Sequence, residues 1–267
     1  EEDPCLALES NQTTRETVLR RLSELHLSTA IEQLQARYRI ELDTSTPSVA
    51  YRETIIGRAV GQHRHKKQTG GAGQFGEVVL QVEPLPRGTG FQFASAVVGG
   101  AIPGSLIPAV EKGVREAMAT GAVAGYPLVD LKVVVTDGKH HPVDSKEIAF
   151  VTAGRKALLA AARNAQTVVM EPIVDLEVQV PQEAMGSVTG DLAGRRGRVL
   201  GTRALPHGRI VVEAQAPLGE LDDYPERLKA MTGGHATYTL ELAQYEPVPE
   251  PLQRRLCAEF RHSDEED

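Results

Sequence analysis

Gln62-His-Arg-His-Lys-Lys-Gln-Thr-Gly-Gly-Ala-Gly-Gln-Phe-Gly76 is the stretch on which the predicted fold depends. It places a cationic run directly before a glycine-rich segment, and the apolar residues 78–82 follow. Glycine accepts positive φ angles and lets backbone N–H groups come close to a partner. The pattern therefore predicts a protruding, hairpin-like loop that leads into a buried strand.

Positive charge gathers in this stretch and in one later stretch, although the formal net charge of the chain is -7. Residues 54–76 contain no Asp or Glu and hold the cations Arg58, Arg64, Lys66 and Lys67. Residues 192–212 also lack acids and hold Arg195, Arg196, Arg198, Arg203 and Arg209. Two such windows in an acidic protein predict surfaces for an anionic partner, such as the phosphate backbone of a nucleic acid. A solvated turn without any partner is the alternative for each window.

Enzyme motifs are incomplete throughout the chain. Residues 71–78 match the glycine-rich loop of kinases, but no kinase lysine strand, catalytic loop or Asp-Phe-Gly segment accompanies them. Residues 99–105 have the spacing of a P-loop without the lysine that reaches the phosphates. The histidine pairs at 63/65 and 140/141 have no further ligand at metal-binding spacing. We therefore predict no catalytic, cofactor-binding or metal-binding residues in this chain.

Length and composition bound the architecture and the location. The 267 residues suffice for two domains or one large one, and no apolar run predicts a membrane helix. Cys5 and Cys257 lie near opposite ends, which favours a reducing, cytoplasmic location. The first residues, Glu1-Glu-Asp-Pro4, resemble neither a signal sequence nor a natural start, so we expect a piece of a longer protein that is monomeric.

The first 168 residues predict two parts that contain strands. Residues 4–43 follow the order strand, strand, helix, strand, with the helix over about 23–38. Further on, strands are predicted at 49–55, 77–83, 91–97 and 128–135, and a helix at 105–119. The capping-box pattern Asp144-Ser-Lys-Glu147 predicts the start of a long alanine-rich helix. The residues around 62–76 and 136–142 are predicted to be exposed polar loops.

Residues 169–250 predict a domain of their own. Strands at 173–180, 198–204, 210–216 and 237–245 and helices at about 184–193 and 224–231 give the order βαββαβ. This order is typical of a ferredoxin-like domain, in which two helices cover one face of an antiparallel sheet. A short helix at 249–260 and an acidic tail are predicted to follow.

Six short segments resemble the C-terminal part of bacterial elongation factor G, in the order that this family has them. They are Ser23-Glu-Leu-His-Leu, Val49-Ala-Tyr-Arg-Glu-Thr-Ile, Gly70-Gly-Ala-Gly-Gln-Phe-Gly, Asp137-Gly-Lys-His-His-Pro-Val-Asp-Ser, Glu171-Pro-Ile and Leu192-Ala-Gly-Arg-Arg-Gly. The likeness runs from residue 1 to about residue 250.

The resemblance implies an α+β fold in successive parts. Residues 1–46 correspond to a truncated, ferredoxin-like domain III. Residues 47–168 correspond to domain IV, of the ribosomal-S5-domain-2-like βαβ type with a left-handed crossover, an exception to the usual hand. Residues 169–250 correspond to the ferredoxin-like domain V, and 251–267 form a C-terminal helix and acidic tail.

The resemblance also implies a function on the ribosome. In this family, domain IV enters the decoding region beside tRNA and mRNA during translocation, while domains III and V contact ribosomal RNA and proteins. The implied contacts at the domain IV tip are Lys66, Lys67, Gln68, Gly70, Gly71, Gly73, Gln74, Asp137, Gly138, Lys139, His140 and His141. Those implied in domain V are Arg195, Arg196 and Arg198. GTP and Mg²⁺ would bind the parent GTPase through a domain that this chain does not contain.

Three classes of function remain open from the sequence. The first is the ribosome-contacting part of a translational GTPase, with ribosome recycling or ribosome protection as variants of its task. The second is a free-standing protein that binds RNA or the ribosome. The third is an enzyme on a ferredoxin-like scaffold. A P-loop upstream in the reading frame would be expected for the first class only.

Overall fold

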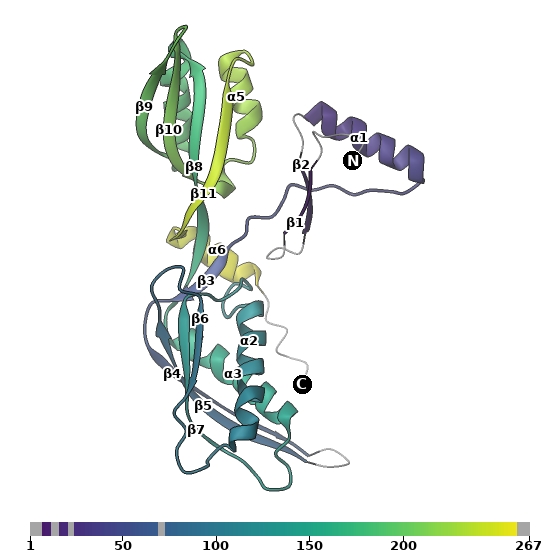
Figure 1. Ribbon diagram of the computed structural model, residues 1–267, viewed down its shortest axis with the longest axis vertical. Helices are drawn as coiled ribbons and strands as arrows, with labels where there is room; N and C mark the ends of the chain where they lie inside the picture. Colours follow the sequence, from purple (N-terminus) through teal and green to yellow (C-terminus); the bar gives the residue numbers. More distant parts are fainter. Residues whose placement is uncertain (1–6, 12–15, 21–23, 69–72, 261–267) are drawn as a thin grey trace. The chain divides into compact units, whose positions relative to one another are not determined.

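The computed structural model describes residues 7–11, 16–20, 24–68 and 73–260 (Figure 1). The chain divides into two compact units by its internal contacts. Unit 1 consists of Glu1–Ala50 and Pro172–Gln244, and unit 2 consists of Tyr51–Glu171 and Tyr245–Asp267. The C-terminal helix therefore belongs with unit 2, which the division of the sequence into successive parts did not anticipate. The predicted acidic tail lies outside the described residues.

A four-stranded sheet forms the framework of unit 2. Its order is β4 (Ala59–Lys67), β5 (Gln74–Pro84), β7 (Leu131–Lys139) and β6 (Phe91–Ser95). The β4–β5 and β5–β7 pairs are antiparallel, whereas β6 and β7 are parallel. The turn η1 (Gly104–Leu106) and helix α2 (Ile107–Thr120) join the two parallel strands. The predicted β-α-β crossover is thus confirmed, and its left hand stays a prediction.

Helices α2 and α3 (Glu147–Asn164) cover one face of this sheet (Figure 1). Alternation along β5 turns Val78, Leu80 and Val82 toward them, and all three are fully buried. Burying each such side chain contributes about 1.5–3 kcal/mol. Small residues let the two helices approach closely, because a Cβ atom at Gly113 would collide with the carbonyl oxygen of Val151.

The structure corrects three local predictions in unit 2. The basic run predicted as a loop is mostly the regular strand β4, and β7 continues to Lys139 instead of ending near residue 135. β4 could not be recognised in the sequence because most of its side chains are polar, and a strand is predicted from alternating apolar residues. The predicted capping box is absent, because the N-cap of α3 is Lys146 and it makes no side-chain capping bond. The Ser145 hydroxyl donates instead to the Phe75 carbonyl oxygen, 2.9 Å away.

A second, smaller group of buried apolar side chains in unit 2 packs the C-terminal segment of the chain against the region of β3 (Arg52–Ile55) and the start of β8 (Thr167–Pro181). β3 pairs antiparallel with residues 167–170 of β8. Helix α6 (Glu250–Glu259) buries Leu256 against Val169 and Ala124. The predicted C-terminal helix is confirmed, and it is held by apolar contacts to unit 2.

Unit 1 contains the predicted ferredoxin-like domain. From β8 onward the order is η2 (Gln182–Ala184), α4 (Met185–Gly194), β9 (Arg198–Leu205), β10 (Arg209–Pro217), η3 (Leu218–Glu220), α5 (Tyr224–Thr232) and β11 (Thr237–Pro247). The strands lie in the order β11-β8-β10-β9, the arrangement of a ferredoxin-like sheet. Leu176 and Val178 of β8 pack with Val188 and Leu192 of α4, while Asp175 on the alternate face is exposed.

The remaining described part of unit 1 is short. β1 (Ala7–Asn11) pairs antiparallel with β2 (Glu16–Arg20), and α1 (Glu24–Tyr38) follows. The predicted third strand, after the helix, is wrong, since residues 39–50 are described and contain no strand. Arg39 has a left-handed φ of 53°, and Ile40 is 46% exposed, so the apolar residues there do not build a buried strand.

Candidate nucleic-acid interface

The two polar loops predicted from the sequence lie at the same end of unit 2. In the β4–β5 hairpin, Lys67 is opposite Gln74. On the other side of β5, Glu77 is opposite Lys139. The end of β7 and the residues that follow it are therefore neighbours of the hairpin, as the ribbon also shows (Figure 1). We call the described residues 66–68, 73–77 and 137–146 the tip; Gly70 and Gly71, predicted as contacts, lie outside the described residues.

Hydrogen bonds join the two halves of the tip. The Phe75 N–H donates to the Asp144 carbonyl oxygen at 2.9 Å, and the Ser145 hydroxyl donates to the Phe75 carbonyl oxygen at 2.9 Å. The His141 N–H donates to the Ser145 hydroxyl at 2.7 Å. Gly73 allows this close approach, because a Cβ atom there would lie 2.9 Å from the Asp144 carboxylate.

The predicted contact residues of the tip differ in how available they are. Lys66, Lys67 and Gln68 are exposed, and no carboxylate among the described residues pairs with either lysine. Gln74 is half-buried, with its side-chain oxygen 3.0 Å from Nε2 of His65. These groups give the hairpin side of the tip two cations that can reach an anionic partner.

On the β7 side, Asp137, Lys139, His140 and His141 are exposed. Gly138 is buried, and a Cβ atom there would collide with the carbonyl oxygen of Glu77. The structure therefore gives Gly138 a packing role, and its contact with RNA stays a prediction.

His141 has its ring turned partly back into its own loop. Its Nδ1 lies 3.4 Å from the Val143 N–H nitrogen, 3.3 Å from that of Asp144 and 3.3 Å from the Asp144 carboxylate. The ring meets Phe75 edge-on, with 6.4 Å between the centroids. Within the described residues, Nε2 of His141 has no hydrogen-bond partner, so this nitrogen is the one that can reach a ligand.

Neighbouring strands neutralise part of the positive charge that the first window suggested. Arg64 Nε lies 2.6 Å from the Glu77 carboxylate, which also accepts from Gln62 at 2.7 Å and has Lys139 Nζ 4.0 Å away. Burial opposes ionisation of Glu77, but the hydrogen bonds from Arg64 and Gln62 outweigh it and hold its pKa below the ordinary value. Similarly, Arg58 pairs with Glu83 at 3.7 Å. The unbalanced charge is therefore confined to fewer residues than the sequence window implied.

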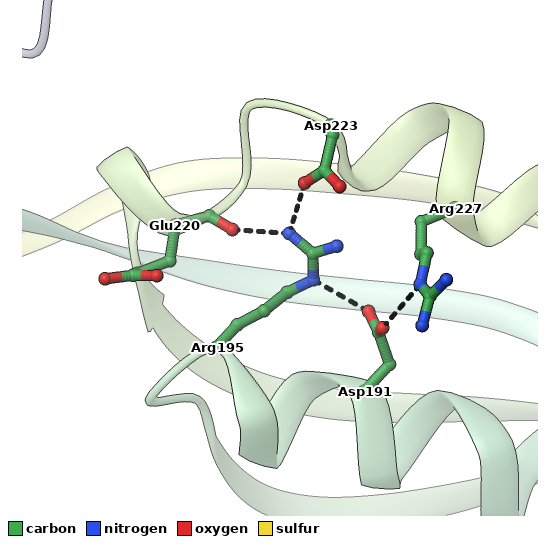
Figure 2. Close-up of polar contacts among 5 residues, drawn as sticks. All are labelled: Asp191, Arg195, Glu220, Asp223 and Arg227. Atoms are coloured by element: carbon green, nitrogen blue, oxygen red, sulfur yellow. Dashed lines mark hydrogen bonds and ion pairs between the residues drawn. The ribbon is translucent and has the colours of Figure 1, made fainter.

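Arg195 is a structural residue of the ferredoxin-like domain. Figure 2 shows its guanidinium between the carboxylates of Asp191, 2.7 Å away, and Asp223, 2.6 Å away. The same group donates to the Glu220 carbonyl oxygen at 2.6 Å, and its side chain is only 13% exposed. Hydrogen bonding to Asp223, and then to Asp191, raises the pKa of Arg195 although burial opposes the charge. The network gives Arg195 a structural role, and its contact with RNA stays a prediction.

The other two predicted arginines of this domain are more accessible. Arg196 has a left-handed φ of 59° and pairs with the Glu220 carboxylate at 2.9 Å, with 34% of its side chain exposed. Arg198 is exposed and donates to the Gln215 side-chain oxygen at 2.7 Å. Neither is buried, so both stay predicted contacts.

Sequence reasoning missed the residues that hold the tip together, Phe75, Asp144 and Ser145. Two of them, Asp144 and Ser145, were visible in the sequence but were assigned to a helix cap that does not form. No local signal places Ser145 beside Phe75, because the two are separated by 70 positions in the chain.

Other kinds of site find little support in the described part of the chain. No cluster of three or more His, Cys, Asp or Glu side chains there has a geometry suited to a metal ion. Among the described helices, none combines the length and the apolar character needed to cross a membrane.

Comparison with known proteins shows that this chain is similar to translation elongation factors. Three family models match in succession: "Elongation Factor G, domain III" over residues 1–46, "Elongation factor G, domain IV" over 47–166 and "Elongation factor G C-terminus" over 168–256. The chain belongs to the elongation factor G family.

Relatives confirm this assignment. An elongation factor G-like protein of Thermotoga maritima is 42% identical over 99% of this chain, and one of Mycobacterium tuberculosis is 46% identical over 96%. Elongation factor G of Aquifex pyrophilus is 41% identical over 97%. A crystal structure from Thermus thermophilus has a TM-score of 0.83 and 43% identity, covering 97% of this chain and 38% of that one. The chain spans 36–39% of the length of these curated relatives.

Proposed function

We propose that this chain is the ribosome-binding C-terminal part of a translation factor that promotes tRNA–mRNA translocation by placing its tip in the decoding region. The GTP and Mg²⁺ that drive such a factor would bind to domains outside the chain. Lys66, Lys67, Gln68, Gln74, Asp137, Lys139, His140 and His141 are the described tip residues proposed to contact RNA.

The observation that carries the proposal is the joined tip itself. Two segments more than sixty positions apart in sequence are fastened by two hydrogen bonds at Phe75, and a third bond closes the turn at residues 141–145. Together the segments present exposed lysines and histidines at one end of unit 2. Side chains held on such a support can bind nucleic acid through charge and hydrogen bonding, without proton transfer. Domain V would add Arg196 and Arg198 as contacts to ribosomal RNA.

The first test replaces His141 by Ala in the full-length factor that carries this chain. Movement of tRNA and mRNA should slow by about ten- to a hundred-fold, because a hydrogen bond to a charged group is worth about 1.5–3 kcal/mol. Ribosome-stimulated GTP hydrolysis should stay near normal, since that chemistry lies elsewhere. Rapid kinetics of a single round of translocation and of phosphate release measure the two rates.

His235→Ala is the matched control, because His235 is an exposed histidine of the ferredoxin-like domain and is not part of the tip. It should leave both rates unchanged. Normal movement in His141→Ala together with a collapse of GTP hydrolysis would show that the tip serves a different task.

Ribosome recycling or ribosome protection is the second candidate function. The observation that favours it is that two of the relatives are named elongation factor G-like proteins and not elongation factor G. In the translocation assay, a recycling factor would show no tRNA–mRNA movement even in its unaltered form. In an assay of subunit separation, it would split ribosomes after termination.

A further inference from the structure

Ser145 occupies the point where the two halves of the tip meet. Its hydroxyl accepts from the His141 N–H at 2.7 Å and donates to the Phe75 carbonyl oxygen at 2.9 Å. Its own N–H donates to the His141 carbonyl oxygen at 3.1 Å. One side chain thus uses both its donor and an acceptor to close the 141–145 turn and to fasten that turn to β5.

The other contacts of the turn cannot fix His141 in the same way. The two amide contacts to its ring Nδ1 are long, at 3.3 and 3.4 Å, and both come from residues of the same turn. The edge-on contact with Phe75 is apolar and tolerates sliding. The Phe75 N–H to Asp144 bond holds the strand to the turn but does not touch His141. Among the described residues, only the Ser145 hydroxyl bonds both to the His141 backbone and to β5.

We infer that Ser145 is a positioning residue that sets where Nε2 of His141 points, and that it does so by linking the His141 backbone to β5. The inference rests on the proposed function, because it assigns to Ser145 an effect on the RNA contact of the tip. Without the hydroxyl, the His141 N–H loses its acceptor, and the turn keeps only one of its two hydrogen bonds to Phe75 of β5, the one at Asp144 that does not touch His141. The ring would then sample several positions, and fewer of them would suit contact with the partner.

Three variants of the full-length factor test this role. Ser145→Ala should slow single-round translocation by about tenfold, since two ordinary hydrogen bonds are lost. Ser145→Thr keeps the hydroxyl and should retain most of the rate. Thr152→Ala removes a hydroxyl that bonds only within α3, to the Ile148 carbonyl oxygen at 3.0 Å, and should have no effect. Ribosome-stimulated GTP hydrolysis should be the same in all three.

A double variant separates positioning from general support of the fold. If Ser145 acts through His141, adding Ser145→Ala to His141→Ala should cause no further slowing. In the chain alone, the His141 amide should exchange its hydrogen at least about fivefold faster in Ser145→Ala, while the amides of α3 stay protected.

Two results would overturn the inference. One is a normal translocation rate in Ser145→Ala when His141→Ala is slow, which would leave the proposed function intact. The other is slowing by Ser145→Ala that multiplies with that of His141→Ala, which would show that Ser145 acts independently of the ring. A normal rate in His141→Ala would overturn the proposed function itself, and the inference with it.

Discussion

Replacing Glu53 by Gln should lower the free energy of unfolding of unit 2 by about 3 kcal/mol or more, because one carboxylate there serves four backbone donors. Glu53 is fully buried on β3. Its oxygens accept from the N–H groups of Ala122 at 2.7 Å, Val123 at 3.1 Å, Ala124 at 2.8 Å and Tyr126 at 3.1 Å.

An amide in place of this carboxylate has only one acceptor oxygen. Its NH₂ group would face two of the backbone donors, so two N–H groups, one of them on a buried residue, would lose their partner. Gly121 also depends on this geometry, since its φ is 78° and a Cβ atom there would lie 2.8 Å from the Glu53 carboxylate. The segment between α2 and β7 is therefore shaped around the charge of Glu53.

Urea unfolding followed by circular dichroism measures this effect, and hydrogen exchange of the α2 amides assigns it to unit 2. Glu116→Gln is the matched control, because Glu116 is exposed on α2, and it should change stability by no more than about 0.5 kcal/mol. Equal stability of the two variants would mean that the four donors find other acceptors.

The second large effect is expected at Arg195. Arg195→Gln should destabilise the ferredoxin-like domain by about 3 kcal/mol, as found when one partner of a buried ion pair is removed. Asp191, which is 11% exposed, would keep only Arg227, whose own side chain is 63% exposed. The Glu220 carbonyl oxygen would also lose its donor, and with it the link between the end of α4 and the segment before α5.

The same substitution decides between a structural role and an RNA contact. The control is Arg198→Gln, because Arg198 is exposed and should affect stability by no more than about 0.5 kcal/mol. Thermal unfolding of the chain and the salt dependence of ribosome binding are the two measurements. Unchanged stability of Arg195→Gln, with a salt slope reduced by about one phosphate contact, would support Arg195 as an RNA contact.

Features carried by local patterns could be predicted from the sequence. The alternating apolar residues of β8 and the turn residues between the later elements gave the ferredoxin-like order, because each strand there has one buried face. The glycines of residues 70–76 indicated a hairpin-like loop. β4 was missed because its one fully buried position is Gly61 and its residues 62–67 are polar. The strand predicted after the N-terminal helix failed for the converse reason, since apolar residues are present there but are not buried.

Pairing between distant charges could not be predicted. Arg195 and Asp223 are 28 positions apart, and Arg64 and Glu77 face each other only because of the hairpin register. An acid-free window in the sequence therefore overestimates the positive charge of the surface, since folding brings acids from elsewhere. Lys66 and Lys67 are exposed and pair with no carboxylate in the described part of the chain, whereas Arg195 lies between Asp191 and Asp223.

The most direct test of the proposed function is directed hydroxyl-radical probing of the ribosome from the tip. An iron chelate would be attached at Val143→Cys, a tip position that is 78% exposed, in the full-length factor with Cys5 and Cys257 replaced by Ala. The control is Arg87→Cys, an exposed position in the turn between β5 and β6, at the opposite end of β5. The chelate at 143 should cleave small-subunit ribosomal RNA in the decoding region, and the chelate at 87 should not. Cleavage of the decoding region from neither position, or from 87 and not from 143, would contradict the assignment of the tip.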